Sequence, residues 1–440
     1  MNYLQSYQFG SRKIPLMIDS AVDSTKNVYT VLIGENGTGK SRLLADMVVK
    51  FTNKDDFYNH KVGKPNVIAA STSPFDIFPR ENKKMIYGKN YSYIGMKRNG
   101  FAMSSPLLLM SSAMIGIIEK YINNENYDEL FHVFSILGFS PNVTLNYRSN
   151  FKFREQFDLF SKGNGNLEDL LGIEISAPYS MSKKRNLESY DDKAEIVTSF
   201  EVLRSYGFDF SAFSMDFNLS DNSIFVKGVK STIEYVKSIF VLIKNGFIRL
   251  LDVKLDKLDT GLISLRRASS GEQCMLMLML GIAANISDNS IILIDEPEIS
   301  LHPKWQENFM PLLMSVFSGY QSCQFIIASH SPQIVSNVSK TNCFVTSISK
   351  GSIYESSYFY NKSSDFQLAE LFDAPGNKNE YITRLCFSLL SKVKENRSVD
   401  DSDLKSLKKI MSFIPILEDK DPLLDLVLSV KEVVTFYASN

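Results

Sequence analysis

One short segment constrains the fold of this 440-residue chain more than any other: VYTVLIGENGTGKSRLLADMVVKF, at residues 28–51. Its pattern predicts an apolar strand, a glycine-rich turn and an amphipathic helix in immediate succession. Gly34, Gly39, Lys40 and Ser41 satisfy the phosphate-loop pattern G-x-x-x-x-G-K-[ST], and the flanking strand and helix are the context that this motif requires. Glycines let backbone N–H groups surround phosphate oxygens, and the helix directs its positive end at them. The segment therefore predicts a nucleotide site on an α/β sheet.

The ligand that we expect at this loop is ATP with Mg²⁺. Lys40 is placed to reach the β- and γ-phosphates, and the Ser41 hydroxyl is placed to bind the metal ion. A chance glycine turn would lack the strand before it and the helix after it. The residues predicted to bind the nucleotide here are Gly34, Asn36, Gly37, Thr38, Gly39, Lys40, Ser41 and Arg42.

A second candidate site follows the apolar run at residues 291–294. Four isoleucine and leucine residues in succession predict a strand that is buried on both faces, as in a parallel sheet. Asp295 and Glu296 then stand at its carboxyl end, where open α/β sheets bind their ligands. We expect Asp295 to hold Mg²⁺ and Glu296 to polarise the water that attacks the γ-phosphate. The alternative for such a pair is a solvated turn.

A third polar cluster, Ser329, His330 and Ser331, ends the apolar strand predicted in CQFIIASHSPQIV. His330 follows Asp295 by 35 residues, and its imidazole is placed to donate a hydrogen bond to the γ-phosphate. The other histidines receive structural interpretations. His60 and His132 are interpreted as packing residues, and His302 as a turn or subunit-contact residue.

The segment RASSGEQ, at residues 267–273, stands before MLMLMLGIAANI, which is apolar around nearly the whole helical circumference. The pattern predicts a buried helix whose amino end is the serine–glycine turn. With Ser270 near the N-cap and free N–H groups at Gly271, this turn is a second anion-binding site that suits a γ-phosphate. One nucleotide does not need two such sites from one chain.

Taken in order, GENGTGKS, SSGEQ, IILIDEPE and ASHSP resemble the phosphate loop, signature, Walker B and switch motifs of ATP-binding-cassette (ABC) ATPases. More narrowly, the chain resembles the soluble branch with the RecF, SMC and OLD-family ATPases and the ATPase subunits of Septu, retron-associated and PARIS anti-phage systems. The resemblance implies an α/β fold with a mixed β-sheet core. In that family two subunits pair head to tail around two ATPs, which implies that Ser270 and Gly271 contact the γ-phosphate bound to a partner chain.

The resemblance implies an Mg²⁺-dependent ATP hydrolase that forms a homodimer or a higher oligomer. By this resemblance Glu296, His330 and Lys40 are catalytic, and Ser41 and Asp295 bind the metal ion. It also implies control of an effector partner, a nuclease or a toxin, in bacterial anti-phage defence, with DNA or RNA as a further candidate partner. A RecF-like DNA-repair ATPase is the alternative. A transporter motor is disfavoured by the long spacing from Lys40 to Asp295.

One departure from the family pattern concerns a glutamine that usually ligates Mg²⁺ after the second core strand. No glutamine occurs between Gln8 and Gln156. The corresponding segment is VIAASTSPFDIFPR, at residues 67–80, where Thr72 and Asp76 are equal candidates for the magnesium role.

The motifs divide the chain into four regions. Residues 1–100 form the first half of the ATPase, with IPLMI as a strand beside the phosphate-loop strand, and residues 101–250 form an inserted, mainly helical lobe. Residues 251–350 form the second half, and residues 351–440 a helical C-terminal region. The acidic residues Glu418, Asp419 and Asp421 are interpreted as a solvated turn.

Composition and charge limit the class of protein. The chain has 48 basic and 49 acidic residues, and a formal net charge of −1 removes any bulk electrostatic argument for binding nucleic acid or membranes. The four scattered cysteines suit free thiols, and no segment has the pattern of a signal peptide or a transmembrane helix, so we expect a cytoplasmic protein. The basic and tyrosine-bearing stretch at residues 79–100 is either a nucleic-acid contact or a solvated hairpin.

Overall fold

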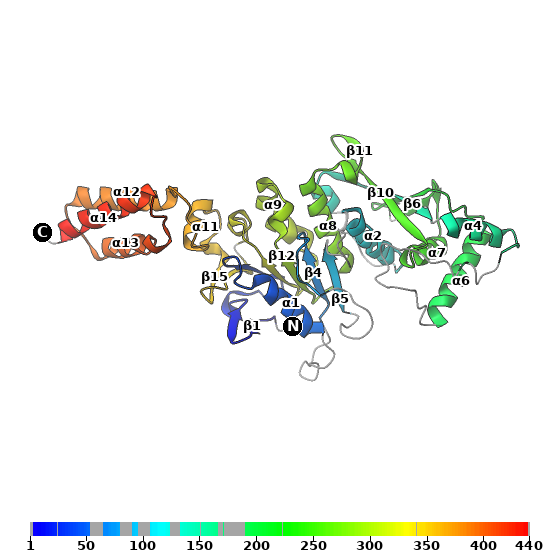
Figure 1. The fold of residues 1–440 in the computed structure, drawn as a ribbon, viewed down its shortest axis with the longest axis horizontal. Helices are drawn as coiled ribbons and strands as arrows, with labels where there is room; N and C mark the ends of the chain where they lie inside the picture. Colours follow the sequence, from blue (N-terminus) through cyan, green and yellow to red (C-terminus); the bar gives the residue numbers. More distant parts are fainter. Residues whose placement is uncertain are drawn as a thin grey trace.

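The structure is a computed structural model that describes residues 3–23, 25–52, 65–79, 90–95, 106–123, 133–149, 151–165, 170, 190–221, 223–339 and 341–438. Figure 1 shows three regions along the long axis of the molecule. Helices of the C-terminal region lie at one end, a helix-covered sheet lies in the middle, and a lobe that is built mainly from the middle of the chain lies at the other end.

The central sheet has seven strands in the order β15-β14-β3-β13-β12-β4-β5. All neighbours pair in parallel except β15, which is antiparallel to β14, so the sheet is mixed as predicted. The strands are β3 (Val28–Ile33), β4 (Val67–Ser71), β5 (Tyr91–Gly95), β12 (Ile291–Asp295), β13 (Gln324–Ala328), β14 (Cys343–Ser347) and β15 (Ser352–Glu355). The carboxyl ends of six parallel strands therefore lie along one edge.

Helices cover both faces of this sheet because successive side chains of each strand point to opposite sides. Leu293 of β12 packs in a core with helix α1 (Lys40–Thr52), whereas Ile292 and Ile294 face the larger core that contains helix α8 (Ser270–Asn285) and helix α9 (Pro303–Val316). From Cys274 to Ala284 every residue of α8 is buried, which confirms the buried helix expected from its apolar run. The strands of the central sheet are therefore packed on both faces up to the edge where they end.

The lobe contains a second, antiparallel sheet in the order β11-β10-β6-β7-β8-β9. Its strands are β6 (Phe139–Ser149), β7 (Phe213–Asn218), β8 (Ser223–Val226), β9 (Val229–Lys230), β10 (Ile248–Lys257) and β11 (Gly261–Ser264), and its helices include α2 (Pro106–Ile122), α4 (Phe151–Ser161), α6 (Tyr190–Ser205) and α7 (Ile233–Lys244). The lobe is therefore not mainly helical and does not end at residue 250 as expected, because its sheet runs on to Ser264. The central pairing joins β6 to β10 across about a hundred residues, so no local hairpin signal marks it.

The C-terminal region is helical, as predicted, with α11 (Ser364–Glu370), α12 (Glu380–Asn396), α13 (Asp401–Met411) and α14 (Pro422–Ala438). It begins later than residue 351, because β15 still belongs to the central sheet. The predicted solvated acidic turn is wrong for Asp421, which is buried and accepts hydrogen bonds from the backbone N–H groups of Lys378 and Leu423.

The strand predicted in IPLMI is β2 (Arg12–Pro15), and it pairs with β1 (Ser6–Phe9) rather than with β3. The two strands that pair with β3 are β14 on one side and β13 on the other. The remaining described elements are short: α10 (Pro332–Ser336), η1 (Asp19–Ala21), η3 (Leu265–Arg267), η4 (Pro297–Ser300), η5 (Ser356–Tyr358) and η6 (Ile414–Ile416). All four cysteines are buried free thiols, and no helix among the described residues is long and apolar enough to cross a bilayer.

Candidate active site

The phosphate loop connects β3 to α1, as its motif predicts. Gly37 and Gly39 have φ angles of 82° and 95°, a left-handed region that glycine adopts without a steric penalty. The Thr38 hydroxyl donates a 2.8 Å hydrogen bond to the Glu35 carbonyl and closes the turn. The loop ends at the amino terminus of α1, where backbone N–H groups and the helix dipole favour an anion.

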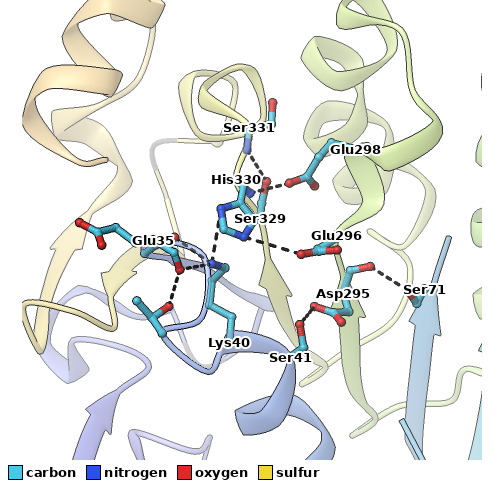
Figure 2. A network of polar contacts seen from close by, with 12 residues as sticks. Glu35, Lys40, Ser41, Ser71, Asp295, Glu296, Glu298, Ser329, His330 and Ser331 are labelled. Carbon is cyan, nitrogen blue, oxygen red and sulfur yellow. Dashed lines mark hydrogen bonds and ion pairs between the residues drawn. The ribbon is translucent and has the colours of Figure 1, made fainter. Parts of the chain in front are cut away.

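Lys40 lies at the centre of the site (Figure 2). Its Nζ donates to the carbonyl oxygens of Gly34 at 2.8 Å and Glu35 at 3.2 Å, and it lies 3.5 Å from Nδ1 of His330. Burial lowers the pKa of Lys40, while the carboxylates of Glu296, Asp295 and Glu298 act in the opposite direction. The ammonium group is therefore held by carbonyl dipoles in a position from which it can turn to phosphate oxygens.

Ser41 and Asp295 meet in space although they are 254 residues apart: Oγ of Ser41 donates to Oδ1 of Asp295 at 3.0 Å. Asp295 is 2% exposed, and this burial raises its pKa to about 7, with smaller contributions from the nearby carboxylates of Glu296, Asp76 and Glu298. So much buried negative charge favours a cation. The hydroxyl and carboxylate oxygens fit Mg²⁺, a hard ion that keeps several water or phosphate ligands and needs few from the protein. In the described part of the chain, no three His, Cys, Asp or Glu side chains form a complete metal site.

His330 lies between Lys40 and Glu296. Its Nε2 is 3.7 Å from Oε1 of Glu296, and burial, reinforced by the charge of Lys40, lowers its pKa to about 4. The imidazole is therefore neutral at pH 7. Because Nδ1 faces an ammonium donor, the ring proton belongs on Nε2, the nitrogen that faces Glu296.

Glu296 follows β12 in a left-handed conformation, with φ 48° and ψ 55°. A residue other than glycine in this region carries backbone strain, which clusters at functional sites. Its backbone N–H donates to the Ala328 carbonyl at 2.9 Å, which extends the ladder between β12 and β13 by one bond. The carboxylate is thus presented at the sheet edge beside His330 and Lys40.

The segment after β4 is tied to the end of β12. Oγ of Ser71 donates to the Asp295 carbonyl at 3.1 Å, and Oγ1 of Thr72 donates to the Glu296 carbonyl at 3.2 Å. Asp76 is 3% exposed and accepts a 2.7 Å hydrogen bond from the Tyr93 hydroxyl. Thr72 and Asp76, the two candidates for the magnesium role of the missing glutamine, both lie near the end of β12. The choice between them stays a prediction.

The serine–glycine turn begins α8, but its N-cap is Ser269 rather than Ser270. The Ser269 hydroxyl accepts from the Glu272 N–H, and the Glu272 carboxylate accepts from the Ser269 N–H, which forms a capping box. Ser270 is exposed. Gly271 is buried, and a Cβ atom there would lie 2.9 Å from Cδ1 of Trp305.

The structure brings Lys40, Ser41, Asp295, Glu296 and His330 into one site. In the described part of the chain, neither Ser270 nor Gly271 hydrogen-bonds to the phosphate loop of its own chain. Asn36 and Arg42 are exposed on or beside that loop, and His302 is the N-cap of α9, consistent with its interpretation as a turn residue. The histidines at positions 60 and 132 lie outside the described residues, as do most residues of the basic stretch: Arg80, Lys83, Lys84, Tyr87, Lys89, Lys97 and Arg98.

Sequence reasoning missed one residue of this site, Glu298. Its Oε1 accepts a hydrogen bond from the backbone N–H of His330 at 2.5 Å. The signal was available in the run DEPE, which places a second glutamate directly after the proline that follows Glu296.

Comparisons with known proteins find one matching family and two relatives named as retron ATPases. The family "AAA domain, putative AbiEii toxin, Type IV TA system" matches residues 138–336. The Retron Ec83 probable ATPase of Escherichia coli is 22% identical over 385 residues, covering 73% of this chain and 67% of the relative. The Retron Vc95 probable ATPase of Vibrio cholerae serotype O1 biovar El Tor is 32% identical over 87 residues, covering 17% and 16%.

Two solved structures illustrate the structural neighbours. An ATP-binding cassette of an ABC transporter, MJ1267, is 13% identical with a TM-score of 0.30, covering 83% of this chain and 95% of its own. The SMC head domain from Thermotoga maritima is 14% identical with a TM-score of 0.19, covering 33% and 68%. The comparisons with relatives confirm the predicted resemblance to P-loop ATPases of the retron-associated type.

Proposed function

We propose that the chain is an ABC-type ATPase that hydrolyses ATP at sites shared between two copies and thereby controls an effector, a nuclease or a toxin, in anti-phage defence. The observation that carries the proposal is the convergence of Lys40, Ser41, Asp295, Glu296 and His330 at the carboxyl edge of three adjacent strands (Figure 2). These five side chains supply the charge, the metal ligands, the base and the donor that phosphoryl transfer to water requires.

Each residue has a defined task in hydrolysis. Lys40 exchanges its two carbonyl acceptors for the β- and γ-phosphates. Ser41 and Asp295 would hold Mg²⁺, which when bound would neutralise charge on the phosphate oxygens. Glu296 accepts the proton of the attacking water, and the neutral His330 donates its Nε2–H to the γ-phosphate as negative charge develops there.

A second copy of the chain is needed because the serine–glycine turn is a binding element without a ligand in its own chain. Ser270 is exposed at the first turn of α8, and no hydrogen bond in the described residues joins it to its own phosphate loop. The ring of Trp305 lies so close to Gly271 that a Cβ atom there would be 2.9 Å from its Cδ1. Such a turn is suited to bind the γ-phosphate of a nucleotide held by the partner subunit.

The role in defence is supported by the relatives named as retron ATPases and by the toxin–antitoxin description of the matching family. The lobe and the C-terminal helices lie at opposite ends of the molecule, with the ATP site between them (Figure 1). Both ends are therefore free of the nucleotide site and suit contact with an effector.

The test of the catalytic base is Glu296→Gln. Glutamine keeps the size of the side chain but cannot accept the proton, so phosphate release should fall by about 100-fold or more while ATP binding persists. Release is measured with a coupled phosphate assay and binding with a fluorescent ATP analogue. Glu307→Gln, on the exposed face of α9, is the matched control. Unchanged phosphate release in Glu296→Gln would remove Glu296 as the base.

The shared site is tested by mixing two inactive variants. Ser270→Arg blocks the turn and Lys40→Ala disables the phosphate loop, so neither should hydrolyse ATP alone. Equal mixing should restore about a quarter of wild-type activity, because half of randomly formed two-fold dimers are mixed and each has one intact site. Full activity of Ser270→Arg by itself would show that the site lies within one chain.

A further inference from the structure

We infer that Glu298 is a positioning residue that fixes His330 by accepting a hydrogen bond from its backbone N–H. The inference deepens the proposed ATPase function and rests on it for its kinetic consequence. Its structural part, the hydrogen bond itself, is tested independently of catalysis.

The need for Glu298 arises from the path of the chain after β12. The strands β12 and β13 pair in parallel as far as Asp295 and Ala328, and one further bond joins the Glu296 N–H to the Ala328 carbonyl. Glu296 then turns the chain into η4. The segment beyond β13 therefore loses its neighbouring backbone at the point where it carries the catalytic histidine, and the Glu298 carboxylate reaches back to supply an acceptor.

The residues on either side of His330 have other tethers. The Ser329 N–H donates to the Leu32 carbonyl at 3.1 Å, and the Ser331 N–H donates to the Ser329 hydroxyl at 3.0 Å. For the N–H of His330 the acceptor is Oε1 of Glu298 (Figure 2). Without that acceptor a partly buried donor is left unpaired, and the segment can move to satisfy it.

A small movement matters because the ring of His330 is held between two other groups of the site. Its Nδ1 is 3.5 Å from Nζ of Lys40 and its Nε2 is 3.7 Å from Oε1 of Glu296. Displacement of the backbone at residue 330 changes both distances together. The expected consequence is slower chemistry with little change in ATP affinity, since the phosphate loop itself is untouched.

The second carboxylate oxygen of Glu298 carries a cost in folding free energy. Its Oε2 is buried and has no hydrogen-bond partner among the described residues. Burial also raises the pKa of Glu298, which favours the neutral acid. An unpaired buried oxygen is a cost in folding free energy that an apolar side chain of the same size would avoid. The hydrogen bond from the His330 N–H is the first of the interactions that offset this cost, followed by those with the Glu298 backbone and the Ser329 side chain.

The experiment compares Glu298→Gln, which keeps an acceptor, with Glu298→Met, which keeps the volume and removes it. Methionine should lower kcat by about 10-fold or more, with KM for ATP within about 2-fold, and glutamine should retain at least about half of wild-type kcat. Glu307→Met on the exposed face of α9 is the matched control. Loss of kcat in Glu298→Gln as large as in Glu298→Met would overturn the acceptor role.

A double-mutant cycle with His330→Ala asks whether Glu298 acts through the histidine. The double variant Glu298→Met/His330→Ala should be no slower than His330→Ala alone, because the positioned group is already absent. If the loss of kcat in the double variant equals the product of the losses in the two single variants, the inference is refuted.

Amide exchange in the nucleotide-free protein tests the hydrogen bond without any turnover. The amide of His330 should exchange faster in Glu298→Met than in wild type. Its exchange rate should be unchanged in Glu298→Gln. Equal exchange in all three would refute the inference even if hydrolysis is confirmed, whereas a wild type that does not hydrolyse ATP would refute the proposed function instead.

Discussion

Replacing Asp295 by asparagine should stabilise the nucleotide-free protein at neutral pH, although it removes a metal ligand. The carboxyl group of Asp295 is 2% exposed and has a pKa of about 7 against an ordinary value of 3.8. This rise in the pKa of Asp295 corresponds to about 4 kcal/mol of unfavourable ionisation in the folded state. Asparagine avoids this cost because it has no ionised form, and it still offers an oxygen to the Ser41 hydroxyl.

The direction in which the free energy of unfolding changes with pH follows from proton binding. Between about pH 4 and pH 7 the folded protein holds a proton on Asp295 that the unfolded chain has lost. The stability associated with this group is therefore fully present below about pH 4 and is lost as the pH rises through 7. About 2–3 kcal/mol of this loss falls between pH 5 and pH 8. The pKa of His330 is lowered, so its contribution to stability rises with pH below about 6.5. This contribution is the same in wild type and in Asp295→Asn and does not affect the difference between them.

The assay is urea denaturation in EDTA at several values between pH 5 and pH 8. The single tryptophan of the chain, Trp305, packs against Gly271 beside the central sheet and reports unfolding of this region by its fluorescence. The difference in unfolding free energy between Asp295→Asn and wild type should grow with pH and level off near pH 8. Parallel curves for the two proteins would show that Asp295 is ionised in the folded state across this range, and the reasoning from burial would fail.

Two further predictions concern the serine–glycine turn. Gly271→Ala should destabilise the protein by about 1–2 kcal/mol in the same denaturation assay, because its Cβ meets Cδ1 of Trp305 at 2.9 Å, and Trp305→Leu should make the alanine better tolerated. Lys257→Met should cost about 1–3 kcal/mol, because it removes a largely buried 2.6 Å bond to Glu272 of the capping box, whereas Lys244→Met, which removes an exposed pair, should cost less than about 0.5 kcal/mol. Equal losses of unfolding free energy in Lys257→Met and Lys244→Met would contradict the expectation that the less exposed pair contributes more.

The features predicted best from sequence were those in which residue type and strand position carry the same signal. The run Ile291–Ile294 has to be buried on both faces, so the polar pair after it has to emerge at the sheet edge, and the same logic placed His330. These positions depend on local pattern plus one general property of parallel sheets, that their carboxyl ends lie together.

What could not be predicted depends on contacts between distant segments or on one backbone angle. The role of Glu298 exists because Glu296 takes a left-handed conformation that turns the chain back toward His330. The lobe sheet depends on β6 pairing with β10, and neither strand has a turn signal that identifies the other. The N-cap is a different case: Ser269 and Glu272 have the spacing of a capping box, so the sequence did contain the information that favours Ser269 over Ser270.

The order of strands in the central sheet has a consequence for synthesis on the ribosome. The phosphate-loop strand emerges by residue 33, yet the two strands that flank it, β13 and β14, are completed only at residues 328 and 347. A nascent or truncated polypeptide that stops before them exposes both edges of an apolar strand and invites aggregation or chaperone binding. Nucleotide binding should therefore arise late in translation, so that prematurely terminated products are inert.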